Sequence, residues 1–279
     1  MDDLATYAEN TWCPGCGNFG ILNAFKKAVR RLEDEGVQRR DIAITAGIGC
    51  HAKIFDYLDL SGFYSIHGRS MATAQGMKLA NPRLKVVAFA GDGDAYGEGI
   101  AHMVFAAKRN ADITVIVHNN GIYGLTTGQY TPTSKKGFRG PSTPEGSVEE
   151  PFSPLALMLS AGATFAGRGY PGRLDHLADV LARAISHEGF SVVDVLQPCV
   201  SFNNTYERYN ASVVEIDETP GSFEDAYRLA CEFDRLAIGV LWQTEKPVYH
   251  KELLQGKVPV EERQSTGQRR QAIAALLQP

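Results

Sequence analysis

Short runs of apolar and β-branched residues alternate along the chain with segments of helical spacing, and this alternation constrains the fold more than any other feature. The runs are continuously hydrophobic, which is typical of strands buried on both faces of a parallel sheet. The pattern therefore predicts an α/β protein with a doubly wound, mostly parallel sheet. The predicted strands are residues 41–45, 63–67, 85–90, 113–118, 163–166, 191–196 and 237–242, and the predicted helices are residues 20–35, 70–80, 97–109, 153–161, 173–187 and 223–233.

Two regions depart from the alternation. Residues 126–154 are rich in Gly, Pro, Ser, Thr and Lys and lack periodicity, which predicts a long loop that is functional or mobile. The polar C-terminal segment, residues 244–279, ends in a short predicted helix at residues 269–277. We predict one α/β domain over residues 1–243 and a C-terminal arm over residues 244–279. This arm lies on a partner subunit or forms a loose tail.

Length and charge exclude several classes of protein. The 279 residues suffice for one large α/β domain with its own core. The formal net charge of −4 leaves no basic surplus for binding nucleic acid. The polar and acidic first ten residues predict no signal peptide, and no stretch approaches the roughly 18 apolar residues of a membrane span. We expect a cytoplasmic protein, because a reducing compartment favours metal binding over disulfides for clustered cysteines.

A Gly-Asp-Gly-Asp sequence at residues 91–94 follows a predicted strand and precedes a predicted helix. Glycines in such a turn let backbone N–H groups approach an anion, and the helix N-terminus adds a favourable partial charge. Asp92 is an oxygen ligand of the kind that Mg²⁺ prefers, and the end of the next strand offers Asn120 and the Ile122 carbonyl. We predict a divalent metal that holds a diphosphate, with a tight turn that binds nothing as the alternative.

Four cysteines fall in turns that flank one edge of the predicted sheet. Cys13 and Cys16 form a C-x-x-C turn before the first helix, and Cys50 and Cys199 each follow a predicted strand. Four thiolates at one edge suit a [4Fe–4S] cluster. A zinc site and a redox-active Cys13–Cys16 disulfide are the alternatives, although structural zinc usually uses two local C-x-x-C pairs. Cys231 lies within a predicted helix and is expected to be a buried apolar residue.

Together these motifs resemble the β subunits of 2-oxoacid:ferredoxin oxidoreductases. The diphosphate box by itself is similar to the motif that binds Mg²⁺ and thiamine diphosphate in thiamine-dependent enzymes. The motifs span about two thirds of the chain in the family's order. They are WCPGCG at residues 12–17, GIGC at 47–50, HGR at 67–69, GDGD at 91–94, NNGIYGLT at 119–126, GQ at 128–129 and PC at 198–199.

The resemblance implies the cofactors and their ligands. Thiamine diphosphate is held through Mg²⁺, and the metal ligands are Asp92, Asn120 and Ile122. One [4Fe–4S] cluster is bound by the cysteines Cys13, Cys16, Cys50 and Cys199. The cofactor-binding residues carried over by position are Gly49, His51, His67, Gly68, Gly91, Asp92, Gly93, Asp94, Asn120, Ile122, Tyr123, Gly124, Leu125 and Thr126.

Four residues are expected near the reacting centre. His67 and Arg69 end a predicted strand and open a helix beside the cofactor motifs. Lys53 offers a cation to the carboxylate of an anionic substrate, and Leu125 is expected above the thiazolium ring. The family often carries other residues after its second glycine, so Asp94 is either a cofactor neighbour or a helix N-cap.

The resemblance also implies the reaction, which is oxidative decarboxylation of a 2-oxoacid with coenzyme A to acyl-coenzyme A and CO₂. Electrons pass through the cluster to ferredoxin, and the reverse, CO₂-fixing direction is chemically permitted. The sequence favours 2-oxoglutarate, while pyruvate and branched-chain 2-oxoacids remain open. A non-redox thiamine-dependent decarboxylase or ligase subunit is the alternative from another class, and a non-catalytic cluster protein is a third.

Thiamine enzymes use a glutamate that bonds the pyrimidine ring of the cofactor, and no candidate for it follows a predicted strand here. In the family that this chain resembles, an α subunit carries the pyrimidine-binding and coenzyme A sites. We therefore expect a heterodimer whose active site forms where the α and β subunits meet.

Overall fold

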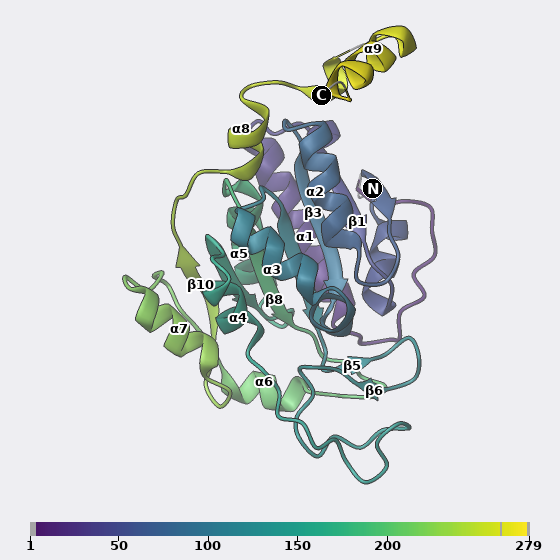
Figure 1. The fold of residues 1–279 in the computed structure, drawn as a ribbon. Coiled ribbons are helices and arrows are strands. Elements are labelled where there is room, and N and C mark those ends of the chain that lie inside the picture. The colour runs from purple at the N-terminus through teal and green to yellow at the C-terminus, as the bar shows by residue number, and fades with distance from the viewer. Residues whose placement is uncertain (1–3, 263, 278–279) are drawn as a thin grey trace.

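The computed structural model describes residues 4–262 and 264–277, and within them an eight-stranded sheet forms the centre of the fold (Figure 1). Its strands are β1 (Ile42–Ala46), β2 (Ser61–Tyr64), β3 (Lys85–Gly91), β4 (Thr114–Asn119), β7 (Phe165–Gly169), β8 (Ser191–Leu196), β9 (Val213–Glu215) and β10 (Leu236–Gln243). Their order is β2-β1-β3-β4-β8-β7-β10-β9. All neighbours are parallel except β7 and β10, which confirms the predicted doubly wound, mostly parallel α/β fold.

Helices cover both faces of this sheet. The α-helices are α1 (Asn18–Asp34), α2 (Ser70–Ala80), α3 (Ile100–Arg109), α4 (Pro154–Ser160), α5 (Leu174–Ser186), α6 (Tyr206–Ser212), α7 (Phe223–Cys231), α8 (Tyr249–Leu254) and α9 (Thr266–Leu276). The core on one face is built with α1 and α5, and the core on the other with α2, α3, α4 and α7.

The longest helix shows how apolar spacing produces this packing. Ile21, Phe25, Val29 and Leu32 recur along α1 at helical intervals, and all four are fully buried. Phe25 meets Phe89 of β3 edge to face, with ring centroids 5.0 Å apart. Burial of each such side chain contributes roughly 1.5–3 kcal/mol to the free energy of folding, so α1 is fixed against the sheet by its apolar face.

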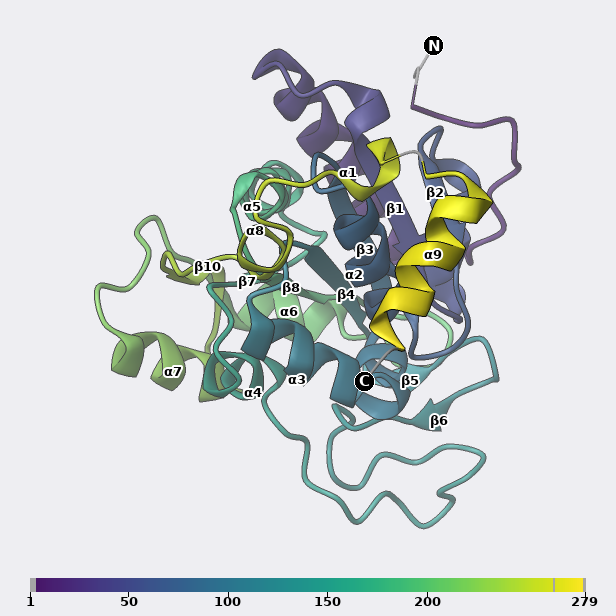
Figure 2. The same ribbon diagram turned by 45° about the horizontal axis from the view of Figure 1, so that its top comes forward.

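Parallel pairing brings the ends of several strands to one edge of the sheet. Gly91 at the end of β3 is paired with His118 of β4, and Asn119 of β4 is paired with Leu196 of β8. The segments that leave these ends include the motifs singled out from the sequence. A small hairpin, β5 (Ile122–Tyr123) and β6 (Gln129–Tyr130), and the long loop that follows it lie at this edge (Figure 1 and Figure 2).

Several boundaries differ from the predicted ones. The second strand is residues 61–64 rather than 63–67, and α3 begins at Ile100 because a π-helical segment, Gly93–Glu98, precedes it. A Cβ atom at Gly93 would clash with the ring of Tyr123, so the backbone there approaches β5 too closely for any side chain. The 3₁₀ segment Cys50–Tyr57, the short helices α6 and α8, and the short strands β5, β6 and β9 were not expected.

The C-terminal segment first packs on the domain and then leaves it. The Asn110 side-chain amide donates hydrogen bonds to the carbonyls of Lys246 and Pro247, and His250 of α8 is buried. None of the described residues of α9 is buried, and Figure 1 shows this helix projecting from the domain. The boundary between domain and arm at residues 243 and 244 stays a prediction.

Parts of the predicted domain and arm, residues 1–3, 263 and 278–279, lie outside the described residues. Cys231 is exposed at the end of α7, so its expected burial was wrong. Over the described part of the chain, none of the helices combines the length and the apolar character that crossing a bilayer requires.

Two truncations test how the C-terminal segment contributes to stability. A chain that ends at Glu262 lacks only the exposed α9 region and should unfold at the same temperature as the full chain. A chain that ends at Thr244 also loses buried Val248 and His250, and its free energy of unfolding should fall by about 2–4 kcal/mol. Thermal and urea unfolding of both chains measure this, and equal losses from the two truncations would contradict the analysis.

Candidate functional site

A cavity at the carboxyl ends of β1, β3 and β4 brings together the residues that sequence analysis assigned to a cofactor. We call it the Asp92 cavity. Its lining residues are Ile48, Gly49, Cys50, His51, His67, Gly91, Asp92, Gly93, Asp94, His118, Asn120, Ile122, Tyr123, Gly124, Leu125 and Thr126. Every predicted cofactor-binding residue lines it except Gly68. For each of these residues, contact with a ligand stays a prediction.

Asp92 is held by hydroxyl groups. Its side chain is buried, and its Oδ2 accepts hydrogen bonds from Thr131 Oγ1 at 2.5 Å and Thr133 Oγ1 at 2.6 Å. Burial raises the pKa of this carboxyl, although the threonine hydroxyls and the Asn120 N–H oppose the shift. An anionic carboxylate in such a place is stabilised by a cation, which fits a divalent metal. Sequence reasoning missed both threonines, because they lie in a loop without periodicity.

The Asn120 turn supplies further oxygen atoms beside Asp92. Its side-chain oxygen accepts the N–H of Ile122 at 3.0 Å, and its side-chain nitrogen donates to Gln197 at 2.9 Å. Gly121, at a φ of +67°, allows the bend between Asn120 and Ile122. The backbone N–H of Asn120 also donates to Asp92 Oδ1 at 3.4 Å, so the three predicted metal ligands belong to one hydrogen-bonded unit.

A chain of hydrogen bonds links Asp92 to side chains on two neighbouring strands, β4 and β8. The Thr133 hydroxyl lies 2.6 Å from Asp92 Oδ2 and 2.9 Å from Asn119 Oδ1, and it has one proton for these two acceptors. The Asn119 amide donates to the buried Asp194 carboxylate, and the Tyr96 hydroxyl also donates to Asp194. Burial raises the pKa of Asp194 to about 6 despite these donors. The orientation of Asp92 is therefore tied to side chains on β4 and β8.

Asp94 is a second buried carboxylate, and two histidines approach it. His67 Nδ1 lies 2.9 Å from Oδ1 and His51 Nε2 lies 3.5 Å from Oδ2, while the Gly68 N–H donates at 2.7 Å. Burial by itself would raise the pKa of Asp94, but the close contacts with the His51 and His67 imidazoles outweigh it and hold the pKa well below its usual value. A Cβ atom at Gly47 would overlap the Asp94 carboxylate, so glycine is required there.

The structure addresses the helix-cap role considered for Asp94, and its role as a cofactor neighbour stays a prediction. The N-cap of α3 is Gly99, and no side chain caps that helix. Asp94 is therefore not a helix cap, and it faces the Asp92 cavity instead. The buried atoms His51 Nε2, His67 Nδ1, Asp94 Oδ2 and His118 Nε2 all line this cavity and make no well-oriented hydrogen bond. Such polar atoms suit a ligand with its own donors and acceptors.

Two of the four residues predicted near the reacting centre line the Asp92 cavity, and the other two do not. His67 lines the cavity, and Leu125 is half-exposed at it. Arg69 does not line it, since its guanidinium lies 3.0 Å from His102 Nε2 at the surface. Lys53 lies beside the cysteines, where its Nζ donates to the Thr11 carbonyl at 3.4 Å. Their catalytic roles stay predictions.

The four predicted cluster ligands line a second cavity, which we call the cysteine cavity and define by Cys13, Cys16, Cys50 and Cys199. The Cys16 N–H donates to the Cys13 carbonyl at 3.0 Å, which closes the C-x-x-C turn. Cys199 is fixed by two backbone hydrogen bonds with Asn203. All four cysteines are free. A disulfide between Cys13 and Cys16, one of the alternatives, is therefore not formed in this structure.

The surroundings of the cysteine cavity oppose ionisation of the Cys16 thiol. Burial raises the pKa of Cys16 to about 11, and the neighbouring sulfurs of Cys199, Cys50 and Cys13 add to the shift. A positively charged metal centre would offset this repulsion. A tetrahedral zinc site draws its sulfur ligands to about 2.3 Å of one ion, but the described chain holds no group of three or more His, Cys, Asp or Glu placed to share a single ion.

The two cavities share a wall. Cys50, Asn120 and Gly124 line both of them, so the Asp92 cavity and the cysteine cavity are adjacent. Cys50 follows β1 through Gly49, while Asn120 and Gly124 follow β4, so the shared residues come from segments that leave the two strands on either side of β3. A cofactor in the first cavity and a metal centre in the second would be direct neighbours.

Two protein families match this chain in succession. Residues 47–195 match the C-terminal TPP-binding domain of thiamine pyrophosphate enzymes. Residues 199–257 match the C-terminal region of the pyruvate ferredoxin oxidoreductase beta subunit. The first match covers the carboxyl ends of the strands that form the Asp92 cavity, and it supports thiamine diphosphate as the cofactor.

Relatives with similar sequences carry consistent names. The 2-oxoacid:ferredoxin oxidoreductase subunit beta of Saccharolobus solfataricus is 42% identical over 85% of this chain and 82% of its own. The 2-oxoglutarate synthase subunit KorB of Archaeoglobus fulgidus is 41% identical over 67% of this chain and 69% of its own. Among solved structures, the 2-oxoglutarate:ferredoxin oxidoreductase from Magnetococcus marinus with 2-oxoglutarate, coenzyme A and succinyl-CoA bound matches with a TM-score of 0.89 and 34% identity. That match covers 99% of this chain and 95% of the other.

The contact between His67 and Asp94 predicts a pH dependence of stability. The close contact with Asp94 raises the pKa of His67 above its usual 6.5, and burial opposes it. The charged histidine thus stabilises the fold fully below about pH 6.5, and this contribution disappears as the pH rises through the raised pKa. The difference in free energy of unfolding between wild type and His67→Gln should therefore be largest at low pH and shrink toward pH 9.

His102→Gln is the matched control for this measurement. Burial and the neighbouring Arg69 lower the pKa of His102, so its contribution has the opposite sign. The difference between wild type and this variant should grow as the pH rises. Urea unfolding across the pH range measures both differences, and a His67→Gln difference that stays constant with pH would refute the assignment.

Proposed function

The chain belongs to the β subunits of the 2-oxoacid:ferredoxin oxidoreductases, and on this basis we propose that it acts in the oxidative decarboxylation of 2-oxoglutarate with coenzyme A. The products are succinyl-coenzyme A and CO₂, and the electrons leave through an iron–sulfur cluster to ferredoxin. The observation that carries the proposal is the wall that the Asp92 cavity and the cysteine cavity share. In this proposal the cofactor site and the electron acceptor site are therefore neighbours.

We assign the Asp92 cavity to thiamine diphosphate and Mg²⁺. Asp92, Asn120 and the Ile122 carbonyl would bind the metal, and the glycines at residues 91 and 93 leave room for the diphosphate. When bound, thiamine diphosphate supplies the electron sink that decarboxylation of a 2-oxoacid requires. Asp94, held between His51 and His67, would present a carboxylate to the bound ligands, with an imidazole beside it.

We assign the cysteine cavity to one [4Fe–4S] cluster. The cluster, when bound, accepts and releases single electrons. Hydrogen bonds reach two of the sulfur atoms, since Ser201 Oγ lies 3.3 Å from Cys13 Sγ and Gln197 Nε2 lies 3.5 Å from Cys16 Sγ. Such hydrogen bonds raise the reduction potential of a cluster. Four free thiols of this kind suit the cytoplasm.

A β subunit of this family implies an α subunit as partner, and we propose that the α subunit completes the active site with the pyrimidine-binding and coenzyme A sites. Leu125, half-exposed at the Asp92 cavity, lies where a partner can cover it. Ferredoxin is the proposed electron acceptor. A non-redox thiamine decarboxylase or ligase would have no use for four cysteines beside its cofactor cavity.

Anaerobic co-expression with the α subunit tests the proposed reaction. We expect reduction of viologen dye that requires 2-oxoglutarate and coenzyme A together, and slower reduction with pyruvate. Faster reduction with pyruvate or a branched-chain 2-oxoacid would reject the substrate. Absence of reduction with all of these acids, in a complex shown to contain iron, sulfide and thiamine diphosphate, would reject the reaction.

Cysteine variants supply the matched control. Cys13→Ala should lower the iron content and abolish dye reduction while thiamine diphosphate still binds. Cys231→Ala, at the exposed end of α7, should change neither.

A second prediction concerns the support of Asp92. Thr133→Val removes the hydroxyl that contacts Asp92 and Asn119, so Mg²⁺-dependent binding of thiamine diphosphate to the complex should weaken roughly tenfold. Thr143→Val is the control, because its hydroxyl donates to the Phe138 carbonyl within the same loop. Titration at fixed Mg²⁺ measures the affinity, and equal affinities for the two variants would contradict a role of Thr133.

A further inference from the structure

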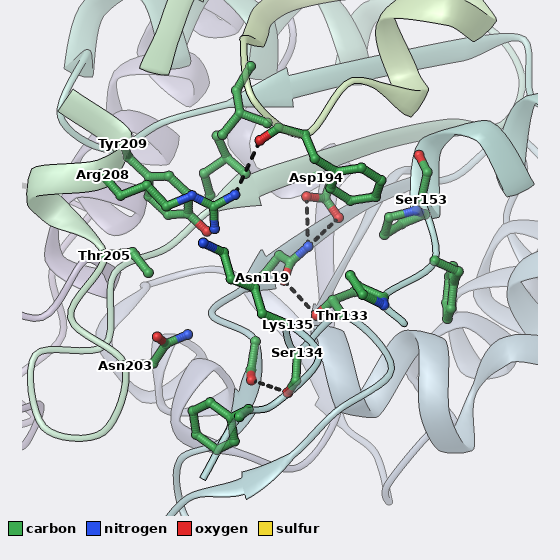
Figure 3. Close-up of a pocket in the computed structure, with 18 of the residues that line it drawn as sticks. Asn119, Thr133, Ser134, Lys135, Ser153, Asp194, Asn203, Thr205, Arg208 and Tyr209 are labelled. Atoms are coloured by element: carbon green, nitrogen blue, oxygen red, sulfur yellow. Dashed lines mark hydrogen bonds between the residues drawn. The ribbon is translucent and has the colours of Figure 1, made fainter. Parts of the chain in front are cut away.

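A third cavity, of about 460 Å³, lies on the other side of the turn that carries Asn120. Its walls are residues 133–138 and 151–154 of the long loop, residues 203–209 around the start of α6, and the ends of β7 and β8 (Figure 3). We call it the loop cavity. Among the described residues, it shares no lining residue with the Asp92 cavity or the cysteine cavity. Its volume is in the range of sites for small organic molecules.

Two cations face each other across the loop cavity. Figure 3 shows the side chains of Lys135 and Arg208 pointing toward one another from the loop and from α6. In residues 4–262 and 264–277 neither side chain has a carboxylate within ion-pair distance; Arg208 donates to the Phe233 carbonyl at 3.2 Å. Burial and the nearby Arg208 lower the pKa of Lys135, and Asp234 opposes this shift. Like charges held together in this way are relieved by an anion between them.

The other charged groups in the lining are already engaged. Asp194 accepts hydrogen bonds from Tyr96 and Asn119. Glu232 pairs with Arg228 at 3.4 Å, and Lys136 pairs with Glu150 at 2.7 Å. The buried guanidinium of Arg168 donates to backbone carbonyls in the segment around α7 and β10. The charge that the cavity offers to a ligand is therefore positive.

The lining also offers a buried hydroxyl and an apolar wall. Thr205 Oγ1 is buried and makes no well-oriented hydrogen bond with the described residues. Phe138, Phe152 and Phe233 supply aromatic surface beside the two cations. A site of this composition suits an organic molecule with an anionic group, rather than a bare inorganic ion.

We propose that the loop cavity binds a small organic anion, whose carboxylate or phosphate group lies between Lys135 and Arg208. Its hydroxyl or carbonyl oxygen meets Thr205, and its apolar part packs on the phenylalanines. The site is separate from the thiamine site, and its existence does not rest on the proposed reaction.

The position of Lys135 couples the two sites. It is two residues beyond Thr133, whose hydroxyl contacts Asp92, and Ser134 between them donates a hydrogen bond to the Gly121 carbonyl at 2.5 Å. An anion that holds Lys135 orders the same loop segment that supports Asp92. Anion binding and Mg²⁺-dependent binding of thiamine diphosphate should therefore strengthen each other by the same factor.

Isothermal titration of the anaerobic αβ complex, saturated with Mg²⁺ and thiamine diphosphate, tests the site. The probes are succinate for a carboxylate and adenosine 5′-monophosphate for a phosphate ester. We expect saturable binding of at least one of them, and the probe that binds identifies the anionic group. Lys135→Met and Arg208→Met should each weaken that binding about tenfold or more, and Lys135→Arg should retain most of it.

Arg139→Met is the matched control, because it removes the same charge from the same loop without lining the cavity. It should bind the probe like the wild type. Absence of saturable binding of either probe would overturn the proposal. So would an affinity that neither Lys135→Met nor Arg208→Met changes, since such binding would occur elsewhere, for instance succinate in the Asp92 cavity.

The coupling has its own readout, which does not require turnover. In the wild type, the probe should tighten binding of thiamine diphosphate to the cofactor-free complex, and in Lys135→Met it should have no effect. Equal affinities with and without a probe that demonstrably binds would overturn the coupling.

Discussion

Parallel strand pairing is the constraint on which the rest of the molecule depends. It aligns β1, β3, β4 and β8 so that they end at one edge, with Gly91 beside His118 and Asn119 beside Leu196. Residues far apart in the sequence therefore leave the sheet within reach of one another. Continuous apolar strands, buried by helices on both faces, fix this alignment, because a change of register would carry buried side chains to different positions. The Asp92 cavity and the cysteine cavity both follow from it.

Three carboxylates are buried near this edge, and each is stabilised in a different way. Asp92 accepts hydrogen bonds from neutral threonine hydroxyls, and burial raises its pKa. Asp94 has two imidazoles, which hold its pKa low in spite of burial. Asp194 accepts hydrogen bonds from a tyrosine and an asparagine, and burial raises its pKa to about 6. Burial therefore raises the pKa of the carboxyl in the first and third cases, while the two imidazoles keep it anionic in the second.

Sequence analysis predicted the fold class and most of the strands, because the apolar periodicity that marks a buried strand is local. It also predicted that Asp92, Asn120 and the four cysteines lie at one sheet edge, because their motifs follow strands. Thr131, Thr133 and Asp194 were missed, because their partners are fixed only by tertiary contacts. The wrong prediction for Cys231 has the same origin, because this residue sits at the exposed end of a helix.

The shared wall formed by Cys50, Asn120 and Gly124 limits how this protein can diversify. A substitution at any of these three positions alters both cavities at once, so neither can be retuned from that side in isolation. The far wall of the cysteine cavity is different, because Ser201 contacts Cys13 and does not line the Asp92 cavity. Adjustment of the potential of the proposed cluster, by natural variation or by protein engineering, is thus directed to positions such as Ser201, which do not line the proposed cofactor cavity.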